Sequence, residues 1–330
     1  MQLLSLFCGA GGLDLGFTLE GYHIHLAIDY SSAAITTHKH NFPESNALEF
    51  DLLDLGVDGL LDLCRKYFDG ESSLGIIGGP PCQGFSRGNI KSYSEDPRNK
   101  LAVLYVDFIE ALKKYYNIKF VVFENVLGIK DAKHITTYEK IIEKFNYLKF
   151  TVSSYVLNAI DFGVAQERKR VIIVALNPEF FNELSLKITP FKRKNVRDVI
   201  FSLPSPSYFS RTISTKEISH HPNHWTMVPK SAKFKDPSLL NGKTRSFRVI
   251  DWDKPSPTIA YGNREIHVHP SKTRRLSIYE AMLLQGFPEN FELKGTFSQQ
   301  VTQVSNAVPP PMAKAIAKAI KTASKGSGYE

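Results

Sequence analysis

One cysteine stands where a reactive side chain would be well presented. Cys82 follows an apolar run at residues 74–77 and the stretch Gly78-Gly79-Pro80-Pro81, and Gly84 and Gly88 follow it. The two prolines restrict the backbone just before the sulfur, and the glycines predict a flexible segment after it. A thiol at the end of a strand, beside such a segment, suits a nucleophile. The alternative is a buried structural cysteine, the more common fate of a single cysteine.

An acid and a pair of arginines could act with a nucleophile. Glu124 follows the apolar run 120–123, so partial desolvation would raise its pKa toward the range of a general acid. The alternative is a helix-cap or loop acid. Further on, alternation along residues 166–170 places Gln166, Arg168 and Arg170 on one side of an extended segment. Two guanidinium groups there could hold an anion or a base edge, whereas an isolated run of this kind is more often a solvated charge cluster.

A glycine-rich turn indicates a cofactor. The sequence Phe7-Cys8-Gly9-Ala10-Gly11-Gly12 follows a short apolar run, and Asp29 lies 20 residues after Gly9. Such a turn lets a ligand approach the backbone, and an acid at the end of the next strand can bind a ribose diol. Together they favour an adenosine-containing cofactor. The alternative is a turn that only tightens a junction between a strand and a helix.

We expect no metal site, no disulfide framework and no membrane span. The three cysteines fit neither a disulfide pattern nor zinc spacing, which indicates a reducing cytoplasm. The clustered histidines lack a cysteine or acid at template spacing, and we expect them on surfaces or strands: His220, His221, His224, His267 and His269. No run of about 18 apolar residues occurs in the chain.

Predicted strands and helices alternate along the first 180 residues, and they must position these side chains. Strands are predicted at 3–7, 23–28, 74–77, 120–123 and 171–176, and helices at 31–40, 101–116 and 135–145. This alternation predicts an α/β fold with a mostly parallel sheet and helices on both of its faces. Ligands bind such sheets at the carboxyl ends of the strands, where the motifs lie.

The second half of the chain differs in character and in charge. The net charge is +8, but residues 187–275 hold 18 of the 41 Lys and Arg and only 6 of the 33 Asp and Glu. The positive charge therefore belongs to one internal, loop-rich segment, which suits a polyanion. Helices are predicted to follow at 276–284 and 309–324.

In this order, the motifs resemble the cytosine-5 DNA methyltransferase family of bacterial restriction–modification systems, and most of all its small single-chain members. Pro81-Cys82-Gln83 is similar to the most diagnostic family motif. Further matches are Asp96–Leu101, Glu124-Asn125-Val126, Arg275-Leu276-Ser277 with Glu280, Gln285–Pro288 and Asn306–Pro309. Asp29 stands where the family more often has Glu. The resemblance covers nearly the whole chain.

The resemblance implies a Rossmann-like fold that depends on S-adenosyl-L-methionine and yields S-adenosyl-L-homocysteine. The implied cofactor residues are Phe7, Gly9, Ala10, Gly11, Gly12, Leu13, Asp29, Asp51, Leu52, Pro81, Leu101, Asn306, Ala307 and Val308. The implied DNA-binding residues are Gln83, Ser86, Arg87, Arg98, Arg245, Arg248, Thr258 and Arg264. Of these, Arg245, Arg248 and Arg264 are candidates for reading guanine in the major groove, although phosphate contacts are more common for arginine.

The implied mechanism begins with a cytosine flipped out of duplex DNA. Cys82 attacks carbon 6, carbon 5 then takes the methyl group, and loss of the carbon 5 proton releases the cysteine. Protonated Glu124 would hydrogen-bond the base at N3. Arg168 would hold the carbonyl oxygen of the base and orient Glu124, with Arg170 as a second support.

The resemblance also implies the domain organisation and the setting. A catalytic and cofactor-binding domain would span residues 1–180, completed by 303–330. A smaller, loop-rich target-recognition domain would span 181–302, with a variable region at about 187–273. We expect a bacterial cytoplasmic, nucleoid-associated monomer that binds double-stranded DNA and is paired in function with a restriction endonuclease.

Three other functions are compatible with parts of this sequence. A transfer-RNA cytosine methyltransferase would share the catalytic set, but the basic region before Arg275 favours DNA. A non-catalytic DNA-binding regulator is disfavoured by the intact set Cys82, Glu124 and Arg168. A dinucleotide oxidoreductase is disfavoured because the turn lacks the third glycine at dehydrogenase spacing.

Overall fold

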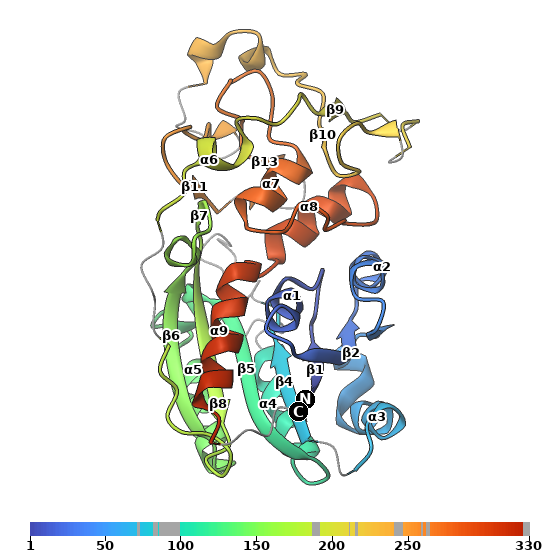
Figure 1. Cartoon of the computed structure of the whole chain (residues 1–330), viewed down its shortest axis with the longest axis vertical. Coiled ribbons are helices and arrows are strands. Elements are labelled where there is room, and N and C mark those ends of the chain that lie inside the picture. Colours follow the sequence, from blue (N-terminus) through green and yellow to red (C-terminus); the bar gives the residue numbers. More distant parts are fainter. Residues whose placement is uncertain are drawn as a thin grey trace.

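Most of the chain is described by a computed structural model. The described residues are 1–70, 73–81, 85, 100–186, 192–210, 212–214, 217–240, 247–258, 260–261 and 265–325. They form a larger part built on a sheet and a smaller part that lies beyond one end of the strands (Figure 1).

The larger part is built on a central sheet of seven strands within the described ranges, in the order β3-β2-β1-β4-β5-β8-β6. The first five strands in that order run parallel, whereas β8 runs antiparallel to both β5 and β6. The strands are β1 (Gln2–Leu6), β2 (His23–Asp29), β3 (Asn46–Glu49), β4 (Ser73–Gly78), β5 (Asn117–Val126), β6 (Thr151–Asn158) and β8 (Lys169–Leu176). The predicted mostly parallel sheet is confirmed. Because the chain leaves β1 toward β2 and returns to place β4 on its other side, a ligand crevice is expected at this switch point.

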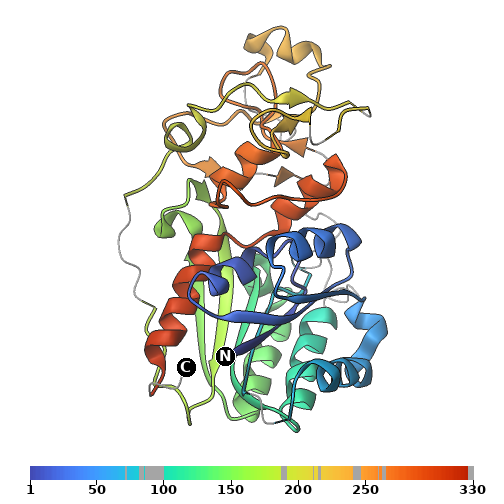
Figure 2. The same cartoon turned by 45° about the vertical axis from the view of Figure 1, so that its right-hand side comes forward.

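Helices cover both faces of the sheet, as predicted. The helices α1 (Gly12–Thr18) and α9 (Pro310–Ala323) pack on one face, and their apolar side chains share a core with Phe120 and Val122 of β5. The other face is covered by α3 (Leu52–Tyr67), α4 (Lys100–Leu112) and α5 (Ile135–Tyr147). The helix α2 (Ser32–Asn41) follows β2 and reaches toward the smaller part (Figure 2). No helix within the described ranges combines the length and the apolar character that a membrane span needs.

The smaller part has short elements and an apolar core of its own. Its longer helices, α7 (Ile278–Leu284) and α8 (Phe297–Asn306), bury Met282, Val301 and Val304 beside Trp225 and Ile250. Its elements are α6 (Val196–Ile200), β9 (Ser207–Tyr208), β10 (Trp225–Thr226), η5 (Ala232–Phe234), η6 (Pro237–Leu239), β11 (Ser256–Pro257), β12 (Ala260–Tyr261), β13 (Glu265–Ile266), α7 (Ile278–Leu284) and α8 (Phe297–Asn306). Ala307 at the end of α8 packs in this core, as do Ala10 and Phe42 of the larger part.

A strand pairing and the returning chain help to tie the parts together. The short strand β7 (Gln166–Glu167) of the larger part pairs in parallel with β11 of the smaller one. After α8 the chain returns to the larger part as α9, which lies along α1 (Figures 1 and 2). The 3₁₀ helices η2 (Leu127–Lys130) and η3 (Ala159–Phe162) complete the described elements of the larger part.

Candidate active site and cofactor turn

The glycine-rich turn joins β1 to α1 at the carboxyl ends of the strands. Its backbone has positive φ at Phe7 (55°), Gly9 (55°) and Gly11 (84°). A side chain in this conformation, as at Phe7, costs backbone energy, and such strain clusters at functional turns. A Cβ placed on Gly9 would meet no heavy atom within 4 Å among the described residues. The turn therefore leaves room for a ligand against its backbone.

Asp29, the last residue of β2, is bonded to this turn. Its Oδ2 accepts from the Gly9 N–H and its Oδ1 accepts from the Ser31 N–H, both at 2.9 Å. Burial raises the pKa of Asp29, and the two backbone N–H donors oppose that rise. A carboxylate oxygen has two lone pairs, so each oxygen can still accept a ligand hydroxyl.

An aromatic residue that the sequence analysis missed lies beside Asp29. The ring of Tyr30 is 61% exposed although its neighbours in β2 are buried. Burial and the charges of Asp29 and Asp51 raise the pKa of Tyr30. Asp51 caps α3 by accepting from the Leu53 N–H at 2.9 Å. The signal for Tyr30 was present in the sequence as an aromatic residue directly after the acid at a strand end.

The chain between α8 and α9 closes over the turn. Asn306 ends α8, and the Val308 carbonyl oxygen lies 2.4 Å from the position of a Cβ on Gly12. A side chain at Gly12 would therefore displace this segment. The Gln285 amide donates to the Ala307 carbonyl at 2.6 Å and fixes it from the smaller part. Residues 306–308, called the cofactor arm from here on, thus lie against the first turn of α1.

Glu124 lies inside β5, paired with Ile172 of β8, and not after the strand as predicted. The strand is longer than the apolar run because the antiparallel partner β8 satisfies its backbone up to Val126. The side chain is buried, and its Oε1 lies 2.8 Å from Nε of Arg170. Burial raises the pKa of Glu124, and the guanidinium groups of Arg170 and Arg168 oppose that rise. Burial thus favours the protonated form of this carboxyl more than water would.

Arg170, in β8, and Arg168, just before β8, make different contacts. Arg170 makes the ion pair with Glu124. Arg168 is 1% exposed, and its Nη2 donates to the Ser305 carbonyl at 2.8 Å, next to the cofactor arm. We expected Arg168 to orient Glu124; Arg170 makes the direct ion pair with that carboxyl, while Arg168 adds positive charge near it and anchors the chain just before Asn306. The Gln166 side chain, predicted on the same side, is fully buried.

The segment that leads to Cys82 passes beside Glu124. A Cβ on Gly79 would lie 2.9 Å from Glu124 Oε2, so only a glycine leaves this carboxyl in place. The Asn125 amide donates to the Pro80 carbonyl at 3.3 Å. Gly79, Pro80 and Pro81 therefore run along the carboxyl ends of β4 and β5, next to the acid.

Several predicted residues lie outside the described part of the chain. These are Cys82, Gln83, Ser86, Arg87, Arg98, Arg245 and Arg264. Within the described part, Arg248 is exposed in the smaller part. The Thr258 hydroxyl donates to the Glu167 carbonyl at 3.0 Å and so links β11 to β7. Leu13 is buried in α1, Leu52 is buried in α3, and Leu101 is half-buried in α4.

The histidines considered for metal are engaged in the core of the smaller part. His224 contacts the Ser277 hydroxyl at 3.0 Å and the Pro204 carbonyl at 2.8 Å. His267 contacts the Thr258 carbonyl at 2.9 Å, and the ring of His221 stacks on Tyr279. They are therefore buried, although we expected surface or strand positions for them. His220 differs in being exposed.

A different set of potential metal ligands lies behind the glycine turn. Single ligand atoms of Cys8, Asp14 and His38 lie within 4.8 Å of one another. However, the Asp14 oxygens already accept from Ser5 Oγ and contact His38 Nε2, each at 2.7 Å. This arrangement fits a buried hydrogen-bonded network that joins β1, α1 and α2.

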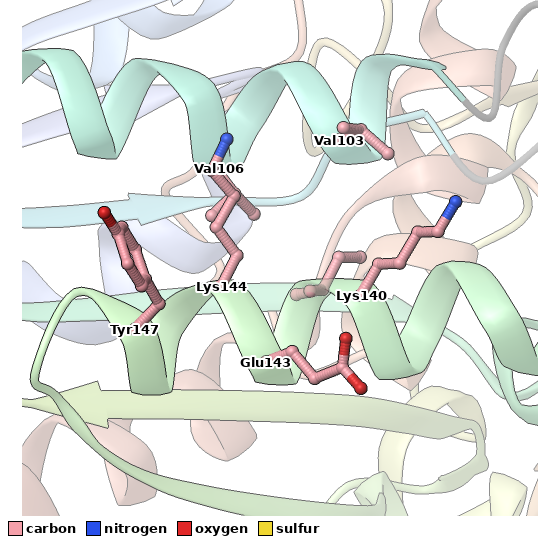
Figure 3. A pocket seen from close by; sticks show the side chains of 7 residues that line it. Val103, Val106, Lys140, Glu143, Lys144 and Tyr147 are labelled. Carbon is pink, nitrogen blue, oxygen red and sulfur yellow. The ribbon is translucent and has the colours of Figure 1, made fainter.

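A pocket of about 360 Å³ lies between α4 and α5, away from these residues. Val103 and Val106 line it from α4, and Lys140, Glu143, Lys144 and Tyr147 line it from α5 (Figure 3). Lys144 forms ion pairs with Asp107 and Glu110 of α4. The pocket lies in the helical layer, not at the carboxyl ends of the strands, and we assign it no part in the site.

Comparison with known proteins places this geometry in a family. Residues 1–322 match the family described as C-5 cytosine-specific DNA methylase. The chain is 32% identical to the type II methyltransferase M1.HphI of Haemophilus parahaemolyticus, over 97% of this chain and 86% of that protein. It is 31% identical to M.MthTI of Methanothermobacter thermautotrophicus, another type II methyltransferase, over 97% of each protein.

The fold is also that of a solved structure. A protein described as a DNA modification methyltransferase encoded within an E. coli prophage superimposes with a TM-score of 0.76 at 23% identity. The superposition covers 98% of this chain and 99% of that chain. The match therefore extends over both parts of the molecule, and the fold is the Rossmann-like fold of methyltransferases. The chain belongs to the C-5 cytosine-specific DNA methylase family and is a DNA cytosine-5 methyltransferase.

Proposed function

We propose that this enzyme methylates carbon 5 of one cytosine within a short specific sequence of duplex DNA, with S-adenosyl-L-methionine as the donor. The observation that carries the proposal is the setting of Glu124. A buried carboxyl with a raised pKa lies against Gly79-Pro80-Pro81, the segment that ends at Cys82. A buried acid beside the segment that leads in sequence to a cysteine, near the glycine turn, suits nucleophilic attack on a ring whose developing charge the acid stabilises.

The residues around the glycine turn fit the cofactor. Open space in front of Gly9 can take the amino-acid end of the ligand, Asp29 can accept the ribose hydroxyls, and the exposed Tyr30 ring can stack on the adenine. Asp51 can accept from the adenine amino group, and the cofactor arm covers the other side. When bound, the cofactor supplies an electrophilic methyl group and leaves as S-adenosyl-L-homocysteine.

The protein residues then act on the base. The Cys82 thiolate forms a bond from Sγ to carbon 6, which makes carbon 5 nucleophilic, and Glu124 donates a hydrogen bond to N3 to stabilise the charge that develops. After the methyl group reaches carbon 5, the carbon 5 proton is lost to solvent, its bonding electrons form the carbon 5–carbon 6 double bond, and the Sγ–carbon 6 bond breaks to return the Cys82 thiolate and the aromatic ring. Arg170 holds Glu124 in place through their ion pair. Arg168 holds Ser305, the residue before the cofactor arm, through the Ser305 carbonyl oxygen.

The ring faces are blocked inside a duplex, so the cytosine must be flipped out at a cost of a few kcal/mol. The basic segment 187–275 supplies positive charge for the phosphates. Arg248 is exposed in this segment and is a candidate for base reading. Because the relatives are type II methyltransferases, we further propose that methylation protects DNA from a cognate restriction enzyme, and that the enzyme acts as a monomer.

The test is transfer of tritiated methyl groups to duplex DNA and to transfer RNA, followed by bisulfite sequencing of DNA from cells that express the chain. We expect incorporation into duplex DNA at one short sequence. Cys82→Ser should abolish transfer while cofactor binding remains nearly intact. Normal turnover in that variant would refute the role of Cys82, and incorporation into transfer RNA alone would favour the RNA methyltransferase alternative.

A further inference from the structure

The backbone of residues 292–294 is hydrogen-bonded entirely by side chains. Asn41 accepts from the Glu292 N–H at 3.1 Å and donates to the Glu292 carbonyl at 2.8 Å. Asn223 accepts from the Leu293 N–H and donates to the Leu293 carbonyl, both at 2.8 Å. The Lys294 N–H donates to Thr37 Oγ1, and the Lys294 carbonyl accepts from Gln303 Nε2, also at 2.8 Å.

These side chains come from different elements. Thr37 and Asn41 belong to α2 of the larger part, Asn223 belongs to the loop before β10, and Gln303 belongs to α8. Both views show α2 close to the end of the smaller part that carries α8 (Figures 1 and 2). The Thr37 hydroxyl also donates to Gln303 Oε1 at 2.6 Å. Thr37, Asn223 and Gln303 are buried, and Asn41 is half-buried. A hydrogen bond broken at one of the buried side chains leaves its partner without water as a substitute.

The chain of α2 also contacts α1 and the glycine turn. His38, next to Thr37, contacts Asp14 of α1 at 2.7 Å, and the Phe42 ring lies against Gly11. On its other side, Thr37 holds Gln303, which is three residues before Asn306. The distance between the glycine turn and the cofactor arm therefore depends on the contacts that α2 makes on both of these sides.

We propose that Thr37 and Asn41 are positioning residues that set the cofactor arm against the glycine turn through the segment 292–294. This inference rests on the proposed binding of S-adenosyl-L-methionine between the turn and the arm. Neither residue touches the reacting atoms. Their effect falls on cofactor affinity, because they fix one wall of the pocket relative to the other.

The experiment compares two adjacent threonines of α2. Thr37→Val keeps the shape but removes both hydroxyl contacts. Thr36→Val is the matched control, because Thr36 is exposed and its hydroxyl bonds only within the helix, to Ser32. Calorimetric titration with S-adenosyl-L-homocysteine should show a Kd raised about tenfold by Thr37→Val, the effect of losing buried hydrogen bonds. Thr37→Ser, which keeps the hydroxyl, and Thr36→Val should bind like the parent enzyme.

Steady-state kinetics separates positioning from catalysis. With saturating cofactor and DNA, Thr37→Val should retain kcat within about twofold while its KM for the cofactor rises, the pattern of lost binding shared by ground and transition states. Should Thr37→Val unfold at the assay temperature, Asn41→Ala gives the second measurement, with the exposed Lys39→Ala as its control. Asn41→Ala should raise the Kd in the same direction.

The outcomes are distinguishable. Equal Kd values for Thr37→Val and Thr36→Val, or a Thr37→Ser variant as impaired as Thr37→Val, would overturn the inference. If the parent enzyme itself binds neither S-adenosyl-L-homocysteine nor S-adenosyl-L-methionine, the proposed function fails instead.

Discussion

At the scale of single residues, the site balances a buried acid against a nearby cation. Glu124 is desolvated by its place in β5, which favours the protonated form, while Arg170 at 2.8 Å favours the ionised form. Burial is the larger influence. The carboxyl can therefore donate a proton or a hydrogen bond to a base and take it back, and Arg170 limits how far its pKa rises.

Replacing the acid by its amide tests this role. We predict that Glu124→Gln lowers kcat by about 100-fold or more, because an amide cannot transfer the proton that general acid catalysis needs. The exposed Glu167→Gln is the matched control and should leave kcat unchanged. Tritiated methyl transfer gives kcat, and circular dichroism shows whether the fold persists. A kcat for Glu124→Gln within a few-fold of the parent would contradict the role of the carboxyl.

Gly79 gives a second prediction, this one about position. A Cβ there would lie 2.9 Å from Glu124 Oε2, whereas a Cβ on Gly70 would meet no described atom within 4 Å. Gly79→Ala should therefore displace the carboxyl and reduce kcat by about tenfold or more, since small misplacements of catalytic groups are costly. Gly70→Ala should not alter kcat. Full activity in Gly79→Ala would mean that Glu124 moves without consequence.

At the scale of elements, the buried strands and most of the long helices could be predicted from the sequence, whereas the edge strands of the sheet could not. The runs in β1, β2, β4 and β5 are apolar because these central strands are covered on both faces. By contrast, β3 and β6 lie at the edges of the sheet, have exposed residues and read as polar segments. The helix α3 was missed because Gly56, with φ of 63°, interrupts it. The residues of β8 also do not indicate that this strand runs antiparallel to its neighbours.

The contact between α1 and α9 carries the element-scale prediction. A Cβ on Gly16 would lie 2.3 Å from the Ala313 side chain and 2.5 Å from the Lys314 backbone nitrogen. Gly16→Ala should push α9 away and move the cofactor arm with it. We expect a loss of about 1–3 kcal/mol in the free energy of unfolding, as for other overpacked sites, and weaker cofactor binding. Denaturant unfolding and titration with S-adenosyl-L-homocysteine measure both effects.

The control for this helix contact lies on the opposite face of α9. Lys318 is exposed, so Lys318→Ala should change stability by no more than about 0.5 kcal/mol. If Gly16→Ala were as stable as Lys318→Ala and bound the cofactor equally well, the close approach of the two helices would not matter for the arm.

At the scale of the whole molecule, the motifs predicted which chemistry occurs but not how the two parts are joined. Glu124 was recognisable because an acid that ends an apolar run is unusual. Thr37, Asn41 and Asn223 were not, because a polar residue in a helix or loop usually faces solvent. Their partner is the backbone of a segment more than 200 residues away for the α2 residues, and no local pattern marks such a contact.

Buried histidines make the smaller part sensitive to acid. Burial lowers the pKa of His221, His267 and His269 from 6.5 to about 4, and it also lowers that of His224. Below pH 6.5 the unfolded chain takes up protons that these folded histidines do not bind. Their contribution to stability is therefore complete above pH 6.5 and is lost as the pH falls toward 4. Glu124 and Asp29 act in the opposite direction, because their folded pKa values are raised.

The four histidines outnumber the two acids, and they lie in the smaller part. We therefore predict that its thermal midpoint is lower at pH 5 than at pH 7.5 by roughly 5–10 °C, since one pKa unit corresponds to about 1.4 kcal/mol. The chain has two tryptophans, Trp225 and Trp252, and both are in the smaller part, so tryptophan fluorescence reports its unfolding. The Trp252 ring also packs against the His269 ring, with 5.1 Å between the ring centroids. His269→Gln should reduce the difference between the two pH values, and a midpoint that is equal at pH 5 and pH 7.5 in the parent protein would show that the buried histidines do not control it.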